Sequence, residues 1–167
     1  MIVRDENSED RAQVRLVNEA AFGRPDEADL VDALRNEGAV LASLVAEIDG
    51  RAVGHILFSR MWIETAGERV PAVALAPVAV LPEHQRLGIG RKLIERGLDF
   101  LRTQAERIVI VLGEPEYYSR FGFSTEKARL LASPFPPEAY MALELRAGAL
   151  DGVRGKVSYA AAFGIPE

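Results

Sequence analysis

The residues best suited to chemistry lie in segment 78–91, where an apolar run ends at Pro82 and a predicted helix begins among two glycines. The first N–H groups of a helix have no intrahelical acceptor, and the helix dipole adds partial positive charge there. Such a helix start binds phosphate, and glycine lets the anion approach the backbone closely. Arg86, Arg91 and Lys92 add positive charge, so the segment predicts a pyrophosphate site.

Two common phosphate loops do not fit this segment. The P-loop needs Gly-Lys followed by Ser or Thr, and the chain contains no such run. The dinucleotide fingerprint needs a third glycine, but Leu93 stands at that place after Gly88 and Gly90. The elements around the segment also lack the regular strand–helix alternation of a doubly wound fold.

Two runs of residues carry a resemblance to a known family. Segment 78–91 reads Val-Ala-Val-x-Pro-x-x-Gln-Arg-x-Gly-Ile-Gly-Arg, which resembles the acetyl-coenzyme A (acetyl-CoA) signature of the GNAT N-acetyltransferases. Segment 118–123 is similar to the family's second marker, a tyrosine four residues before Gly-Phe. The two markers stand in the expected order, and the element order matches the family over nearly the whole chain.

The resemblance implies a role for each matching residue. Val78, Ala79 and Val80 match the strand whose backbone pairs with the pantetheine arm of the cofactor. The loop whose amides hold the pyrophosphate matches Gln85, Arg86, Leu87, Gly88, Ile89, Gly90 and Arg91. Tyr118 matches the tyrosine that protonates the departing thiolate. That donation is mild if the pKa of the phenol is about 10 and that of the thiol about 8.5.

One departure from the family pattern affects the placement of the acid. Many members carry an asparagine after the penultimate strand, where this chain has Gly113 followed by Glu114 and Pro115. Few residues separate that strand from Tyr118, so Tyr117 is an alternative acid. The spacing to the Gly-Phe pair favours Tyr118.

The general base is less well indicated. An attacking amine must lose a proton, and Glu114, at the expected end of a strand, is the first candidate. A solvated loop acid is nevertheless the simpler explanation of Glu114. His84 lies in the pyrophosphate loop, and His55 lies in a strand as a core or edge residue. The stiff segment 134–137, Pro-Phe-Pro-Pro, either lines the acceptor pocket or is a plain loop.

Periodicity and turn residues predict the elements that position these groups. Predicted helices cover about 8–22, with Ser8 as cap, then 25–37, 89–104 and 115–120. Predicted strands cover 40–48, 51–60, 71–81, 107–112 and 140–145, with a weak signal at 157–159. This order predicts a single α/β domain over residues 1–167, a sandwich with a mixed sheet. The resemblance implies a GNAT-type fold with a mostly antiparallel central sheet flanked by helices. Gly97, inside a helix, is a predicted close-packing position.

Composition narrows the function. The net charge is −5, so nucleic acid is not an expected partner. No run of 18 apolar residues and no signal peptide is evident, so we expect a cytoplasmic protein without a membrane partner. With no cysteine, the chain offers neither a thiol nucleophile nor a thiolate metal site, and no metal is expected.

The function implied by the resemblance is N-acetyl transfer. An amine of an unidentified small molecule or peptide would attack the thioester of acetyl-CoA directly, without an acyl-enzyme. A coenzyme A (CoA)-binding sensor without turnover is the alternative, and a binder of another nucleotide phosphate is a second. A homodimer stays open.

Overall fold

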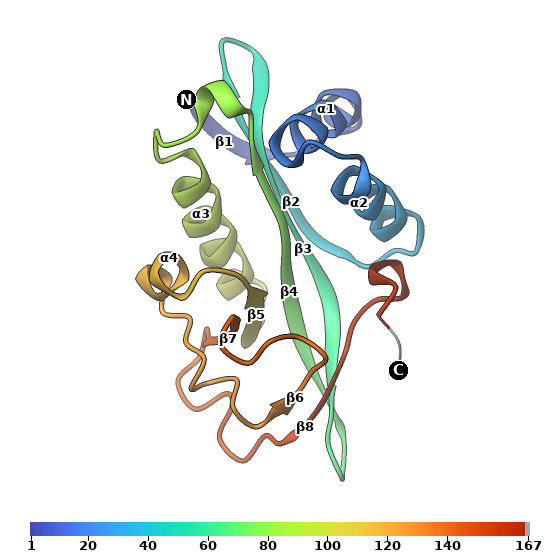
Figure 1. Cartoon of the computed structure of the whole chain (residues 1–167), viewed down its shortest axis with the longest axis vertical. Helices are drawn as coiled ribbons and strands as arrows, with labels where there is room; N and C mark the ends of the chain where they lie inside the picture. Colours follow the sequence, from blue (N-terminus) through green and yellow to red (C-terminus); the bar gives the residue numbers. More distant parts are fainter. Residues whose placement is uncertain (166–167) are drawn as a thin grey trace. The chain divides into compact units, whose positions relative to one another are not determined.

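The computed structural model of the chain describes residues 1–165, and within them the strands form one eight-stranded sheet (Figure 1). The strands are β1 (Ile2–Asp5), β2 (Val40–Ile48), β3 (Arg51–Glu64), β4 (Arg69–Val80), β5 (Ile108–Leu112), β6 (Leu131–Ala132), β7 (Tyr140–Glu144) and β8 (Gly155–Ser158). The main path runs β1–β2–β3–β4–β5–β7, and β8 pairs with β3 and β6. Pairs β4–β5 and β6–β8 are parallel, whereas β1–β2, β2–β3, β3–β8 and β5–β7 are antiparallel.

Helices precede and interrupt the strands. They are α1 (Arg11–Phe22), α2 (Asp26–Asn36), α3 (Ile89–Thr103) and α4 (Pro115–Tyr118), with short 3-10 turns η1 (Ser8–Asp10), η2 (Pro82–His84), η3 (Ser119–Phe121) and η4 (Ala161–Phe163). The predicted fold class, a mixed and mostly antiparallel sheet with flanking helices, is confirmed. Within residues 1–165, no helix is long and apolar enough to cross a lipid bilayer.

The start of the first helix differs from the prediction. Ser8 is not the cap: the side chain of Asn7 accepts a hydrogen bond from the Glu9 N–H at 2.9 Å. Asp10 answers by accepting from the Asn7 N–H at 2.8 Å, which completes a capping box. Ser8 is the first residue of η1, so the cap position falls one residue earlier, at Asn7.

The described chain divides into two compact units. Unit 1 contains Met1–Ser59 and Ala76–Phe100, and unit 2 contains Arg60–Leu75 and the chain from Leu101 onward. Strands β3 and β4 each contribute residues to both units. A single domain over residues 1–167 therefore stays a prediction, and each unit is described by itself.

In unit 1, successive residues of β3 face different helices. A Cβ built on Gly54 would lie 3.0 Å from Ile89 of α3, whereas the neighbouring His55 contacts Asn18 of α1. Side chains alternate between the faces of a strand, so α3 covers one face of β3 and α1 the other. Figure 1 shows α1 and α2 on one side of β2 and β3, and α3 on the opposite side.

In unit 2, β5 and β7 form the centre of the core. Their register runs from Ile108 opposite Glu144 to Leu112 opposite Tyr140. One continuous apolar cluster packs around this pair, and it comprises Met61, Ile63, Ala72, Ala74, Ile108, Ile110, Ala128, Leu131, Tyr140, Ala142, Ala149, Leu150 and Val157. The end of β5, which precedes the predicted acid, is therefore held by the packed core of unit 2.

Candidate active site

The end of β4 in unit 1 leads directly into the predicted phosphate loop. Ala79 is buried, and its neighbours Val78 and Val80 are half-buried, so the strand exposes part of one face. Pro77 has no N–H and cannot donate to a regular ladder at that position. The Leu81 N–H donates to the carbonyl of Val53 at 2.9 Å, which anchors the strand end to β3.

Two residues in the loop between η2 and α3 have a left-handed backbone conformation. The backbone φ is +65° at Arg86 and +82° at Gly88. A Cβ at Gly88 would meet no atom within 4 Å, so the space in front of this residue is open. The Lys92 N–H donates to the Gly88 carbonyl at 3.1 Å, which opens the hydrogen-bond ladder of α3. The amides of residues 89–91 precede that bond and have no acceptor in the helix, as phosphate binding requires.

One side chain anchors this loop to β4, and others give it positive charge. The Gln85 side chain donates to the carbonyl of Val80 at 3.0 Å, tying the loop to the strand. Arg86 and Lys92 are exposed, and Arg91 forms an exposed ion pair with Glu95 at 2.8 Å. Such an exposed pair contributes only a few tenths of a kcal/mol, about 0.3–0.5, so it can yield to an anion. The predicted loop residues therefore lie together at one helix start.

His84 lies in η2, at the base of this loop. Its Nδ1 atom is buried and has no hydrogen-bond partner among the described residues. Its backbone N–H donates to the Leu81 carbonyl at 2.8 Å. The placement of His84 outside the reaction centre stays a prediction.

The corner after β5 in unit 2 places the predicted acid. Glu114 has the extended conformation expected before a proline, and Pro115 opens α4. The Tyr118 N–H donates to the Glu114 carbonyl at 3.0 Å, closing one helical turn. Helical side chains point back toward the N-terminus, so the Tyr118 ring lies over Gly113.

Aromatic neighbours enclose the Tyr118 ring. Its centroid lies 5.1 Å from that of Tyr117 and 5.8 Å from that of Phe123, both edge to face. Burial, with a smaller contribution from Tyr117, raises the pKa of Tyr118 to about 12. This pKa lies above the reference value of about 10 because the ring is buried among aromatic side chains. Tyr117 is only half-buried, and its ring lies 5.8 Å from the guanidinium of Arg120.

Glu114 lies at the same corner and is exposed. Its side chain is exposed and makes no capping hydrogen bond to α4, although its carbonyl accepts from Tyr117 and Tyr118. Sequence reasoning noticed Gly113 only as a departure from the family pattern. The structure shows that its α-carbon is the surface on which Tyr118 rests. The short spacing between β5 and Tyr118 was the sequence feature that could have indicated this contact.

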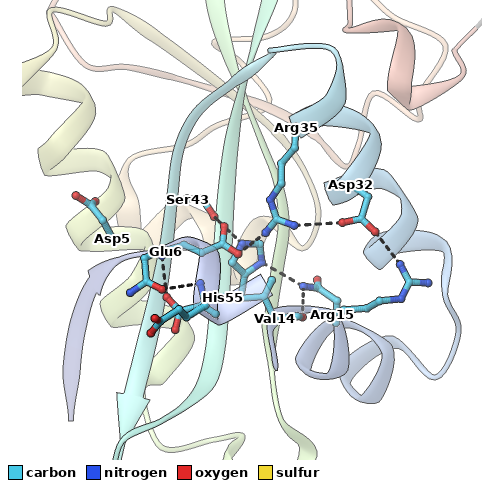
Figure 2. Close-up of polar contacts among 12 residues, drawn as sticks. Asp5, Glu6, Val14, Arg15, Asp32, Arg35, Ser43 and His55 are labelled. Atoms are coloured by element: carbon cyan, nitrogen blue, oxygen red, sulfur yellow. Dashed lines mark hydrogen bonds and ion pairs between the residues drawn. The ribbon is translucent and has the colours of Figure 1, made fainter. Parts of the chain in front are cut away.

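A serine beside a histidine can form a hydrolytic dyad, and Ser43 lies beside His55. The buried hydrogen-bond network in unit 1 shows that this pair is not such a dyad (Figure 2). The Asn18 amide nitrogen donates to Val14 O at 3.0 Å and meets His55 Nδ1 at 3.1 Å. An amide nitrogen only donates, so the network assigns the imidazole proton to Nε2, which faces Ser43 Oγ at 2.8 Å. Ser43 in turn donates to Glu6 at 2.7 Å. A nucleophilic serine needs the opposite polarity.

His55 therefore has the predicted role of a satisfied core residue. Complete burial, and secondly the Arg35 guanidinium, lower its pKa to about 3. Arg35 and Glu6 form a close ion pair beside the serine, as Figure 2 shows. The imidazole stays neutral and serves the packing of α1 on β3.

A pocket of about 590 Å³ lies in unit 2, beside segment 134–137. Phe135 forms one wall and stacks on Tyr140, with ring centroids 5.8 Å apart. The carboxylates of Glu126 and Glu138 lie at its rim. Among residues 1–165, no group of three or more His, Asp or Glu side chains is arranged to hold a metal ion.

The sequence matches known proteins over most of its length. The sequence model of the acetyltransferase (GNAT) domain family matches residues 3–125. The uncharacterized N-acetyltransferase YjhQ of Escherichia coli is 41% identical over 134 residues, covering 77% of this chain and 74% of that protein. The uncharacterized N-acetyltransferase YhbS of Escherichia coli is 34% identical over 162 residues, covering 95% and 96%.

Solved structures agree with the sequence matches. YhbS from Escherichia coli in complex with CoA superposes with a TM-score of 0.89 at 33% identity, covering 98% of this chain and 91% of that one. A GNAT family acetyltransferase from Brucella melitensis in complex with acetyl-CoA gives a TM-score of 0.81 at 39% identity, covering 97% of both. The chain therefore belongs to the GNAT family of acetyl-CoA-dependent N-acetyltransferases.

Proposed function

We propose that this protein transfers the acetyl group of acetyl-CoA to an amine by direct attack of the amine on the thioester. The observation that carries the proposal is the loop at Gly88, which has a left-handed φ and open space beside its α-carbon at the start of α3. Two proteins of similar fold, at 33% and 39% identity, have been solved with CoA and acetyl-CoA bound, respectively. Their ligands support binding of the same cofactor by this chain.

In this proposal the cofactor lies along unit 1. The amides of residues 85–91 hold the pyrophosphate, and the exposed cations Arg86 and Lys92 add attraction. The backbone of Val78, Ala79 and Val80 pairs with the pantetheine arm. A backbone N–H at this strand end meets the oxyanion that forms on the thioester carbonyl.

The chemistry balances without a covalent enzyme intermediate. The amine nitrogen forms a bond to the carbonyl carbon, the C–S bond breaks, and the thiolate takes a proton while the amine loses one. Tyr118 supplies a hydrogen to the sulfur. Because its pKa is about 12, complete transfer to a thiolate of pKa about 8.5 costs roughly 5 kcal/mol. Tyr118 therefore acts as the acid through a hydrogen bond to the sulfur that strengthens as the C–S bond breaks, and the released thiolate takes its proton from solvent.

The remaining roles follow from position. Glu114, an exposed carboxylate near Tyr118 in sequence and in unit 2, is the candidate base that accepts the amine proton, directly or through water. The pocket beside Phe135 is the candidate acceptor site. Arg129 lies 3.6 Å from Glu126, so Glu138 is the better placed carboxylate for a cationic amine. Replacing Glu138 by Gln should raise KM for cationic amines and leave KM for acetyl-CoA unchanged.

The test has two arms. Acetyl-CoA should raise the melting temperature in a dose-dependent way, by the equivalent of about 2.7 kcal/mol at a hundredfold excess over Kd. ADP should be clearly weaker, because it lacks the pantetheine arm. An unmoved melting curve, or equal effects of ADP and CoA, would contradict the donor assignment and favour another nucleotide phosphate.

The second arm measures thiol release from acetyl-CoA over a panel of polyamines, amino acids and peptide N-termini. Release with at least one amine supports the enzyme. Tight binding without release over the whole panel would favour the alternative of a CoA-binding sensor. The cytoplasmic location, consistent with a chain free of cysteine, and the homodimer stay predictions for fractionation and light scattering.

A further inference from the structure

The ring of Tyr118 lies directly on the α-carbon of Gly113. A Cβ built on residue 113 would come within 2.5 Å of the ring atom Cε2 and 3.0 Å of Cδ2. Ordinary carbon–carbon contacts are about 3.5–4.0 Å, so no side chain fits between the two residues unless the ring moves.

The backbone of Gly113 does not itself require glycine. Among the described glycines, those with positive φ are Gly23, Gly38, Gly50, Gly88, Gly122, Gly148, Gly152 and Gly164. Gly113 therefore has a conformation that L-residues adopt. The contact with Tyr118 is the steric reason for glycine at this position.

Neither partner can move aside easily. The Gly113 N–H donates to the Ala139 carbonyl at 2.9 Å, which fixes the backbone at the edge of the β5–β7 pair. The Tyr118 ring is 9% exposed and packs edge to face on Tyr117 and Phe123. A side chain at residue 113 would thus displace the phenol as a unit, within a rigid aromatic surrounding.

We propose that Gly113 is a positioning residue for the Tyr118 hydroxyl, an inference that rests on the proposed role of Tyr118 as the acid. The bare α-carbon sets the depth and tilt of the phenol. In this chain, a Cβ at residue 113 and the observed position of the Tyr118 ring exclude each other.

The kinetic test is a double-mutant cycle with Gly113→Ala and Tyr118→Phe, read by thiol release from acetyl-CoA with the best amine of the panel. Gly113→Ala should lower kcat by about tenfold to a hundredfold, since an error of about 1 Å has that effect, with KM for acetyl-CoA within about twofold. In the Tyr118→Phe background the same change should alter kcat by less than about twofold. Equal losses in both backgrounds, or wild-type kcat in Gly113→Ala, would overturn the inference.

Gly67→Ala is the matched control. A Cβ at Gly67 meets no atom within 4 Å, and its φ is not in the left-handed region, so turnover should stay at the wild-type level. If Gly113→Ala does not fold, Tyr118→Ala serves as a second background, because it removes the ring. There, adding Gly113→Ala should cause no further loss in the free energy of unfolding, and a further loss as large as in the wild-type background would contradict the contact.

A readout without turnover separates this inference from the proposed function. The chain has four tyrosines, so labelling their ζ carbons with ¹³C gives four signals, and Tyr118→Phe assigns one. In Gly113→Ala the titration of Tyr118 should move down from about 12 toward 10, because the displaced ring becomes exposed. An unmoved titration refutes the positioning of the ring. Wild-type turnover in Tyr118→Phe, with the titration shifted in Gly113→Ala, would instead refute the acid role alone.

Discussion

The α-carbon of Gly97 in α3 lies beneath the ring of Phe58 in β3, so closely that a Cβ there would come within 2.2 Å of Cε2. Gly54 of β3 meets Ile89 of the same helix in the same way, at 3.0 Å from an added Cβ. Two close contacts, one on each partner, therefore hold α3 against β3. These contacts therefore also position the phosphate loop at the start of α3.

Replacing Gly97 by Ala should destabilise unit 1. Alanine improves intrinsic helix propensity by about 1 kcal/mol, but forcing the Phe58 ring away costs about 1–3 kcal/mol or more. We expect a net loss in the free energy of unfolding, measured by urea denaturation. Gly67→Ala, which meets only open space, should change it little. A stabilised Gly97→Ala variant would show that the ring adapts freely.

Replacing Gly88 by Ala should weaken acetyl-CoA binding. The φ of +82° costs an L-residue about 1–2 kcal/mol, so the loop will relax and turn its amides away from the anion. We expect about a tenfold rise in Kd by calorimetry. Gly38→Ala has a similar φ of +72° and equally open space, so it should lose similar stability but no affinity. Equal Kd values for the two variants would remove the loop from the site.

Strong local patterns made most of the fold predictable. The stripe of α3 and the turn at Asp49 and Gly50 were placed within a residue or so, since each is written in neighbouring residues. Strand β1 was missed because Val3 is its single buried residue, too little for a periodic signal. Strand β3 continues four residues past the predicted end at Arg60, to Glu64, because Arg60 is a half-buried residue that the pattern treats as a stop.

Tertiary contacts account for what local patterns could not show. Strand β8 starts at Gly155, earlier than predicted, and a Cβ there would lie 2.1 Å from the carbonyl of Glu64. Glycine weakens the sequence signal of a strand, yet here it permits the close approach of strands β8 and β3. The markers likewise located Tyr118 by spacing, but its burial and its contact with Gly113 depend on residues brought together only by folding.

The buried His55 predicts a stability loss in mild acid. Its pKa is about 3 in the folded protein and about 6.5 when unfolded, so the unfolded state binds the extra proton. The contribution is complete above pH 6.5 and is lost as pH falls toward 3. The slope should approach roughly 1.4 kcal/mol per pH unit between pH 6 and 5, above the range where most carboxylates titrate.

Urea unfolding at pH 7, 6 and 5 measures this slope. His55→Gln should be less stable at pH 7, because the contacts with Asn18 and Ser43 change, but its slope should be flatter. A slope unchanged in His55→Gln would show that other groups cause the acid sensitivity.

Tyr118→Phe and Tyr117→Phe decide which phenol serves the leaving thiolate. Tyr118→Phe should lower kcat by about a hundredfold or more, the usual contribution of a positioned acid, while Kd for acetyl-CoA stays unchanged. Tyr117→Phe should keep kcat within about twofold. Because burial raises the pKa of Tyr118 to about 12, the phenol keeps its proton below that pH, so wild-type kcat should show no loss from its ionisation up to a pH of about 11. An unchanged kcat in Tyr118→Phe together with a hundredfold loss in Tyr117→Phe would transfer the role to the more exposed tyrosine.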